Sequence, residues 1–111
     1  MVKELVKRYV AIYLSKDIKN ETLTKIIEED LMAYLGFLYP TKVAQVKYVK
    51  NVGKIRILSF MLRRGFDPHT LIPILSLIKA NDCWIEPLLM SGTLRSLQES
   101  LKVRYPELAQ G

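Results

Sequence analysis

Few residues of this sequence could act as catalysts, and they do not form a catalytic pattern. His69 is the single histidine, so neither a Ser-His-Asp relay nor a histidine-rich metal site can be assembled. Cys83 is the single cysteine, has no base beside it, and is expected in the core. Glu28, Glu29 and Asp30 form the one acidic cluster, but consecutive helix positions point in different directions, which favours a solvent-facing side over a metal site. The five glycines are scattered singly and form no phosphate-binding loop. We therefore expect no catalytic residue, metal or cofactor in this chain.

Basic residues carry more information. The 111 residues include 17 Lys and Arg against 11 Asp and Glu, a formal net charge of +6. Between Asp30 and Asp67 there is no acidic residue, and the basic residues of that interval are Lys42, Lys47, Lys50, Lys54, Arg56, Arg63 and Arg64. Uncompensated cations repel one another unless an anion lies nearby, which favours a phosphate-facing surface. A solvated, lysine-rich hairpin is the alternative.

Two further features could contact nucleic acid. Tyr9 and Tyr13 share the outer face of a predicted strand with Lys7, and sheet-type RNA binders stack bases on such aromatics. The matching later strand lacks the usual aromatic pair, so the ordinary RNA-recognition signature is absent, and the tyrosines could instead pack under the last helix or against another subunit. Ser91, Gly92 and Thr93 precede a predicted helix with Arg95 in its first turn, where backbone N–H groups attract anions. Spacing alone favours a plain helix cap there.

The elements that would position these residues follow from hydrophobic periodicity. Residues 7–14 alternate, with Val10 and Ile12 on one face, and predict a strand. From Asn20 an apolar stripe predicts a helix that ends near Gly36 and Pro40; its members are Leu23, Ile26, Ile27, Leu31, Tyr34, Leu35 and Leu38.

The second half predicts a hairpin, a helix, a strand and a last helix. Segments 42–49 and 53–60 are strands joined by a tight turn, with Ile55 and Ile57 on one face and Lys54, Arg56 and Leu58 on the other. Asp67 or Thr70 caps a helix expected to reach Asn81. CWIEPLLM is a strand at an edge, or bulged, at Pro87. SGT opens a helix that has Leu94, Leu97 and Leu101 on one face.

This order predicts one domain, residues 1–111, of the α+β class: a ferredoxin-like antiparallel sheet (β-α-β-β-α-β) with two helices on one face and an extra C-terminal helix of unassigned placement. The first ten residues are basic and then apolar, but Glu4 and the lack of a small-residue cleavage site argue against a signal peptide. No apolar run is long enough to span a membrane. With a single cysteine, these features predict a cytoplasmic protein.

Three motifs resemble one known family. The segments K-R-Y-V-A-I at Lys7–Ile12, G-K-I-R-I at Gly53–Ile57 and S-G-T-L-R-S-L at Ser91–Leu97 are similar, in order and spacing, to those of the ribonuclease P protein component 2 family. These are the archaeal and eukaryotic small subunits of the Pop-five/Rpp-fourteen type. The chain departs from the family in having Ile57 in place of a cysteine, Glu86 at a position where a basic residue is expected, and a last helix with fewer basic residues that includes Glu99.

The resemblance implies an RNA-binding subunit of ribonuclease P, the ribonucleoprotein that removes the 5′ leader of precursor tRNA. It implies a partner, ribonuclease P protein component 3, in a heterotetramer with two copies of each, and chemistry done by the RNA with Mg²⁺ bound to that RNA. The residues expected to bind RNA are Lys7, Arg8, Lys47, Lys50, Lys54, Arg56, Arg63, Arg64, Ser91, Thr93 and Arg95. The alternative from another class is a ferredoxin-like ligand-sensing or regulatory domain that dimerises through its sheet, because this fold serves many functions.

Overall fold

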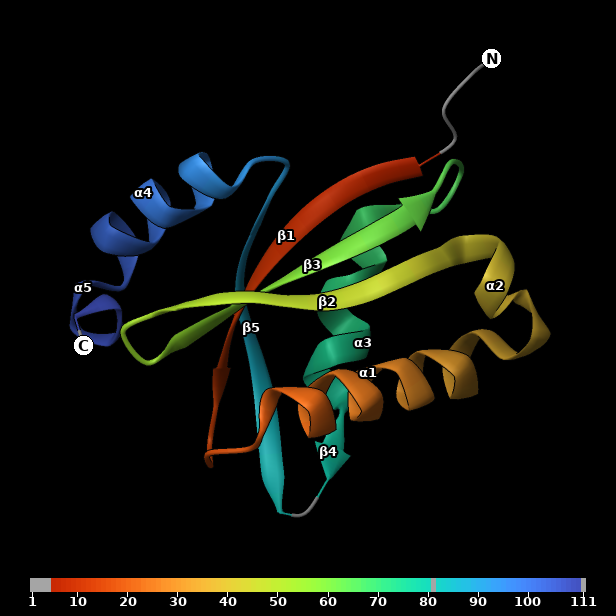
Figure 1. Cartoon of the computed structure of the whole chain (residues 1–111), viewed down its shortest axis with the longest axis horizontal. Helices are drawn as coiled ribbons and strands as arrows, with labels where there is room; N and C mark the ends of the chain where they lie inside the picture. The colour runs from red at the N-terminus through yellow and green to blue at the C-terminus, as the bar shows by residue number, and fades with distance from the viewer. Residues whose placement is uncertain (1–4, 81, 111) are drawn as a thin grey trace.

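Four long antiparallel strands organise the chain (Figure 1). In the computed structural model, which describes residues 5–80 and 82–110, a two-residue strand joins them, and the order across the sheet is β2-β3-β1-β5-β4. The strands are β1 (Leu5–Leu14), β2 (Val43–Val52), β3 (Ile55–Arg63), β4 (Lys79–Ala80) and β5 (Cys83–Ser91). The expected antiparallel α+β class is confirmed. Glu4 and Asn81, which entered the sequence predictions, lie outside the described residues.

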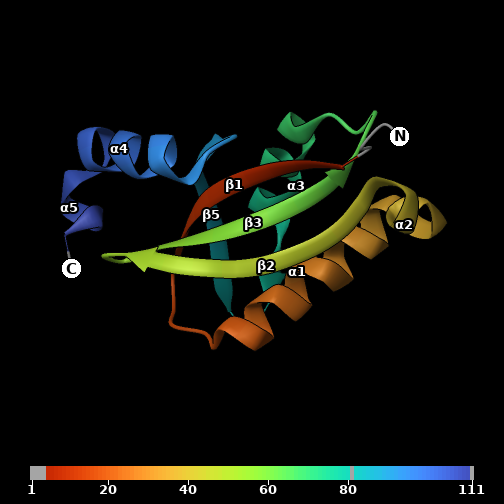
Figure 2. The same ribbon diagram turned by 45° about the horizontal axis from the view of Figure 1, so that its top comes forward.

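Helices cover both faces of this sheet. Figure 2 shows α1 and α4 on opposite sides of the β2–β3 hairpin. The helical segments are α1 (Asn20–Leu35), η1 (Gly36–Leu38), α2 (Tyr39–Lys42), η2 (Pro68–Thr70), α3 (Leu71–Leu77), α4 (Leu94–Arg104) and α5 (Pro106–Ala109). Gly36 ends α1 as predicted: at φ 61° it donates its N–H to the carbonyl of Met32, in a backbone region that glycine tolerates best.

The larger core lies between one sheet face and helices α1 and α3. Its fully buried members include Val10 and Ile12 of β1, Leu58, Phe60 and Leu62 of β3, Leu23, Ile27 and Leu31 of α1, and Leu71 and Leu75 of α3. Each such side chain contributes roughly 1.5–3 kcal/mol of transfer free energy on burial. This core is what holds α1 and α3 on the sheet, as the alternation in β1 and the stripe in α1 predicted.

A second, smaller core fixes the last helix. Leu97 and Leu101 of α4 pack on Ala11, Ile55 and Ile57, which face away from the larger core. β3 therefore has buried apolar side chains on both faces: Ile55 and Ile57 point to α4, and Leu58, Phe60 and Leu62 point to α1 and α3. Sequence periodicity left the placement of α4 open, and it covers the end of the second sheet face next to the β2–β3 turn (Figure 2).

Two sequence predictions differ from the structure. The helix expected to reach Asn81 ends at Leu77, because Lys79 pairs with Trp84 in a β4–β5 hairpin whose turn places Asp82 at φ 58°. The apolar stripe was predicted to run through Leu38 on one helix face, but α1 ends at Leu35 and Leu38 lies in η1, and the stripe residue Tyr34 is 53% exposed.

Pro87 behaves as predicted. The ladder between β1 and β5 slips where Ala11 faces Leu89 and Ile12 faces Pro87, which makes a bulge at the proline. A proline has no N–H to donate to a ladder. The bulge therefore lies where the regular ladder would lack a hydrogen bond. Cys83 is buried, as expected for a core residue.

Candidate nucleic-acid interface

Cations from β1 and β2 share the sheet face that α4 covers only at one end. Lys47 lies opposite Ser59, and Ser59 lies opposite Tyr9, in adjacent ladders. Tyr9 in turn lies opposite Ser91 of β5. Paired residues of antiparallel strands point to the same side, so these four side chains form one row across β2, β3, β1 and β5. We term the row, with its neighbours on the same side, the open face; its members are Lys47, Ser59, Tyr9, Ser91, Lys7 and Lys50.

The open face has positive charge without nearby compensation. Lys7, Lys47 and Lys50 are exposed, and none of them belongs to an ion pair among the described residues. Strands β1, β2 and β3 contain six basic residues and no acidic one: Lys7, Arg8, Lys47, Lys50, Arg56 and Arg63. Binding of an anionic polymer to such a surface is favourable, because the lysines neutralise phosphates and counterions are released.

Tyr9 has two environments at once. It is half-buried and packs against the core under α4, as the alternative for the tyrosines anticipated. Its ring also has the Lys7 ammonium 5.4 Å from its centroid, a cation–π geometry on the open face. Tyr9 can therefore offer a ring surface beside a cation without moving from the core.

The start of α4 continues the open face at Ser91. The Thr93 hydroxyl accepts from the Ser96 N–H at 3.3 Å, and the Ser91 hydroxyl accepts from the Thr93 N–H at 3.3 Å. Both hydroxyls therefore cap the helix, as the plain-cap alternative expected.

Two arginines flank this helix start. Arg8 lies beside Gly92: a Cβ atom placed on Gly92 would be 3.6 Å from the Nη1 atom of Arg8. Arg95 is exposed, with Nε 4.0 Å from a carboxylate oxygen of Glu99. An exposed pair at that distance is weak, so Arg95 keeps most of its capacity to meet another anion.

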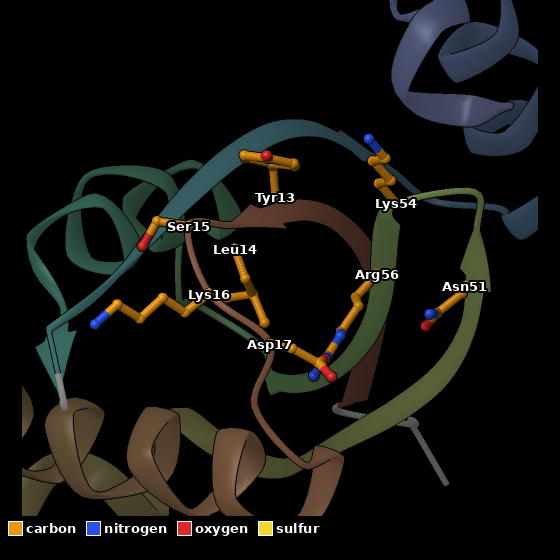
Figure 3. Close-up of a pocket in the computed structure, with 8 residues that line it drawn as sticks. All are labelled: Tyr13, Leu14, Ser15, Lys16, Asp17, Asn51, Lys54 and Arg56. Atoms are coloured by element: carbon orange, nitrogen blue, oxygen red, sulfur yellow. The ribbon is translucent and has the colours of Figure 1, made fainter. Parts of the chain in front are cut away.

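A separate surface pocket of about 250 Å³ brings together Lys54 and Arg56 (Figure 3). Its other lining residues are Tyr13, Leu14, Ser15, Lys16, Asp17 and Asn51. Figure 3 shows the Arg56 and Asp17 side chains meeting, whereas Lys16 and Lys54 extend in different directions. The basic side chains of this pocket therefore do not point toward a single position where one anion could bind.

Arg56 is engaged inside the protein. Its guanidinium donates to the Asp17 carboxylate and the Ile18 carbonyl, and to the Asn20 side-chain oxygen at 3.1 Å. Its side chain is 12% exposed. Arg56 thus fastens the segment between β1 and α1 to β3, a role that the sequence did not indicate because the segment lies far from Arg56 in the chain. RNA contact by Arg56 stays a prediction.

The remaining predicted residues lie at two ends of the β2–β3 hairpin. Arg63 and Arg64 are exposed where β3 ends. Lys54 is exposed in the turn and donates its backbone N–H to the Leu108 carbonyl at 2.8 Å. Beside it, Gly53 has φ +60° and a Cβ there would lie 2.3 Å from that carbonyl oxygen, so only glycine fits. The G-K-I-R-I segment therefore has a folding role at Gly53, Ile55, Arg56 and Ile57.

Sequence reasoning missed Ser59 and Lys16. Ser59 is a buried polar residue in the centre of the row, and Lys16 borders the pocket. Only the pairing register places Ser59 next to Tyr9 and Lys47, so no sequence signal could have identified it.

No group of three or more His, Cys, Asp or Glu side chains suited to a metal ion occurs among residues 5–80 and 82–110. In the same ranges, no helix has both the length and the apolar character needed to cross a membrane. No known family model matches the chain, and no curated protein is similar enough to count as a relative.

Proposed function

We propose that this chain is an RNA-binding protein subunit of ribonuclease P that contacts the RNA through the open face. The resemblance of three segments to the component 2 family supports the assignment. The strand order β2-β3-β1-β5, with α1 and α3 packed on one face, supports a ferredoxin-like fold, which is the fold that the resemblance implies.

One observation carries the RNA-binding part of the proposal. Lys7, Lys47 and Lys50 are exposed on one sheet face, with no acidic residue in the strands that bear them. Beyond Tyr9 and Ser91, the first turn of α4 adds the exposed Arg95. RNA phosphates supply the missing negative charge, and the Tyr9 ring beside Lys7 is suited to contact a base or ribose.

The proposed mechanism is electrostatic. Lysines placed among RNA phosphates reduce the repulsion between RNA strands, so the catalytic RNA folds and holds precursor tRNA at a lower Mg²⁺ concentration. The RNA with its Mg²⁺ does the chemistry, and this chain supplies no catalytic group. In this proposal the chain acts in the cytoplasm together with component 3, two copies of each.

Reconstitution tests the function. Cleavage of a precursor tRNA by the cognate ribonuclease P RNA and component 3 is followed at moderate Mg²⁺ with and without this chain. We expect cleavage to depend on the chain and to fall for Lys47→Gln/Lys50→Gln. The matched control, Lys25→Gln/Lys102→Gln, removes the same charge from α1 and α4 and should retain activity. A chain that neither binds this RNA nor changes its cleavage would sink the proposal.

The regulatory-domain alternative has one observation in its favour. Leu5, at the end of the open-face side of β1, is 45% exposed, so part of this sheet face is apolar. Such a domain would dimerise through the sheet and would show no steep salt dependence with RNA. Sedimentation of the chain alone, set beside its RNA affinity, separates the two functions.

A further inference from the structure

The end of α1 and the η1 turn carry a concentrated set of exposed apolar side chains. Among the described residues, eight large hydrophobic side chains are exposed, and four of them lie within residues 32–38. We term these four the α1 overhang: Met32, Tyr34, Phe37 and Leu38, which are 48%, 53%, 92% and 46% exposed. Exposed apolar residues scattered singly are normal, whereas four within seven consecutive residues make this segment a candidate interaction site.

Two members of the overhang, Tyr34 and Leu38, belong to the apolar stripe predicted for α1 but lie partly outside the core that the stripe covers. Tyr34 lies seven residues, close to two helical turns, after Ile27 and therefore points the same way. Ile27 is fully buried, whereas Tyr34 is half-exposed. The final turn of α1 and the α2 corner lie at one end of the molecule in both ribbon views (Figures 1 and 2). At Tyr34 the apolar face of α1 thus extends beyond the part that is buried in the larger core.

The backbone holds Phe37 outward. Gly36 turns the chain at φ 61°, and the following 3₁₀ turn is closed by the Tyr39 N–H donating to the Gly36 carbonyl. This hydrogen bond fixes the backbone that carries Phe37, whose side chain is 92% exposed. A ring displayed on a fixed turn is suited to insert into a partner at little entropic cost.

Charge distinguishes this surface from the open face. Residues 28–41 include Glu28, Glu29 and Asp30 and no basic residue, in a chain with a net charge of +6. Phosphates of RNA would be repelled there. The carboxylates border the overhang on the same helix, so a partner that covers the apolar side chains meets negative charge at the rim.

We propose that the α1 overhang docks a segment of another protein that presents apolar side chains flanked by lysine or arginine. A second copy of this chain is the less suitable occupant, because two overhangs brought face to face would oppose their own acidic residues, and the lysines of the open face would be occupied by RNA; in this last respect the inference rests on the proposed function. α1 packs on the opposite side of the sheet from the open face, so a protein and an RNA can bind together.

The test uses a fluorescent amphipathic Leu–Lys peptide as the basic probe and a Leu–Glu peptide of the same length as its acidic counterpart. Fluorescence anisotropy should show that the chain binds the basic peptide and does not bind the acidic one. Phe37→Ser should weaken that binding about tenfold or more, the loss typical of an aromatic anchor. Val103→Ser, which changes a 78% exposed apolar residue of α4, should leave it unchanged, and Glu29→Gln should weaken it by a smaller factor that shrinks in high salt.

Three results would overturn the proposal: equal binding of the two peptides, equal effects of Phe37→Ser and Val103→Ser, or a dimer of the chain alone that Phe37→Ser dissociates. The last result would assign the overhang to a second copy. Tyr34→Ser provides a second variant with the same expected loss. RNA affinity is measured on the same samples. A wild-type chain that binds the peptide but no RNA would refute the proposed function and leave the docking surface standing.

Discussion

The salt dependence of RNA binding gives the sharpest test of the open face. Lys47→Gln/Lys50→Gln removes two of its three exposed lysines and no side chain of either core. Each phosphate contact contributes about −0.7 to the slope of log K against log[salt] for single-stranded RNA, so the three lysines give about −2 and the double variant loses about 1.4 of that slope. Between 50 and 200 mM salt, these lysines account for a loss of roughly twentyfold in wild-type affinity and about threefold in the variant.

Filter binding or anisotropy with a labelled ribonuclease P RNA, over that range of salt, measures both slopes. Lys25→Gln/Lys102→Gln has the same net charge as the open-face variant, so any difference between the two variants depends on position and not on total charge. If both variants show the same slope, the reasoning that places RNA on the open face is wrong. A reduced slope in the open-face variant alone, with an unchanged urea midpoint, would support it.

Three further predictions concern stability. Arg56→Ala should lower the free energy of unfolding by about 1 kcal/mol, because it removes the hydrogen bonds that a side chain only 12% exposed donates to the part-buried Ile18 carbonyl and Asn20 side chain, and urea titration would measure this; an unchanged midpoint would refute the role given to Arg56. Gly53→Ala should cost a similar amount or more, since a positive φ costs about 1–3 kcal/mol for other residues and the new methyl meets the Leu108 carbonyl; hydrogen exchange should then show faster exchange of the Lys54 amide, and unchanged protection would argue against the contact. Burial and then the Glu28 carboxylate raise the pKa of Tyr39, so its contribution to stability is complete below about pH 10 and is lost as pH rises through the higher folded-state pKa. Tyr39→Phe should flatten the alkaline fall in urea midpoint, and an identical fall in both proteins would contradict this.

Local patterns predicted the elements because each pattern is set by neighbours in the chain. The alternation around Val10 and Ile12 gave β1, and the stripe through Leu23 and Ile27 gave α1. Patterns of this kind show that a face is covered without showing what covers it. β3 did contain a usable signal, since its apolar residues fall on both faces, which requires a helix on each side of the sheet.

The candidate site was predictable in its chemistry and not in its geometry. The excess of lysine in β2 identified Lys47 and Lys50 from composition alone. The row that joins Lys47 to Tyr9 depends on the β2–β3 and β1–β3 registers, which bulges in β2 shift. Arg56 shows the converse: its charge suggested RNA, but the fold brings Asp17 to it, and that approach depends on tertiary packing.

The docking of the tail on the β2–β3 turn has a consequence for folding. Ile55 and Ile57 pack in the smaller core with α4 and with Tyr105, Leu108 and Ala109. The turn at Gly53 lies against Leu108, whose carbonyl accepts the Lys54 N–H. These covering segments come much later in the sequence than the hairpin. During synthesis the hairpin therefore leaves the ribosome with one apolar face uncovered, and contacts between distant segments form slowly. Until α4 closes, that face is the part of the nascent chain most exposed to chaperones and to aggregation, so variants that weaken the Gly53 contact should lower the soluble yield more than their equilibrium stability suggests.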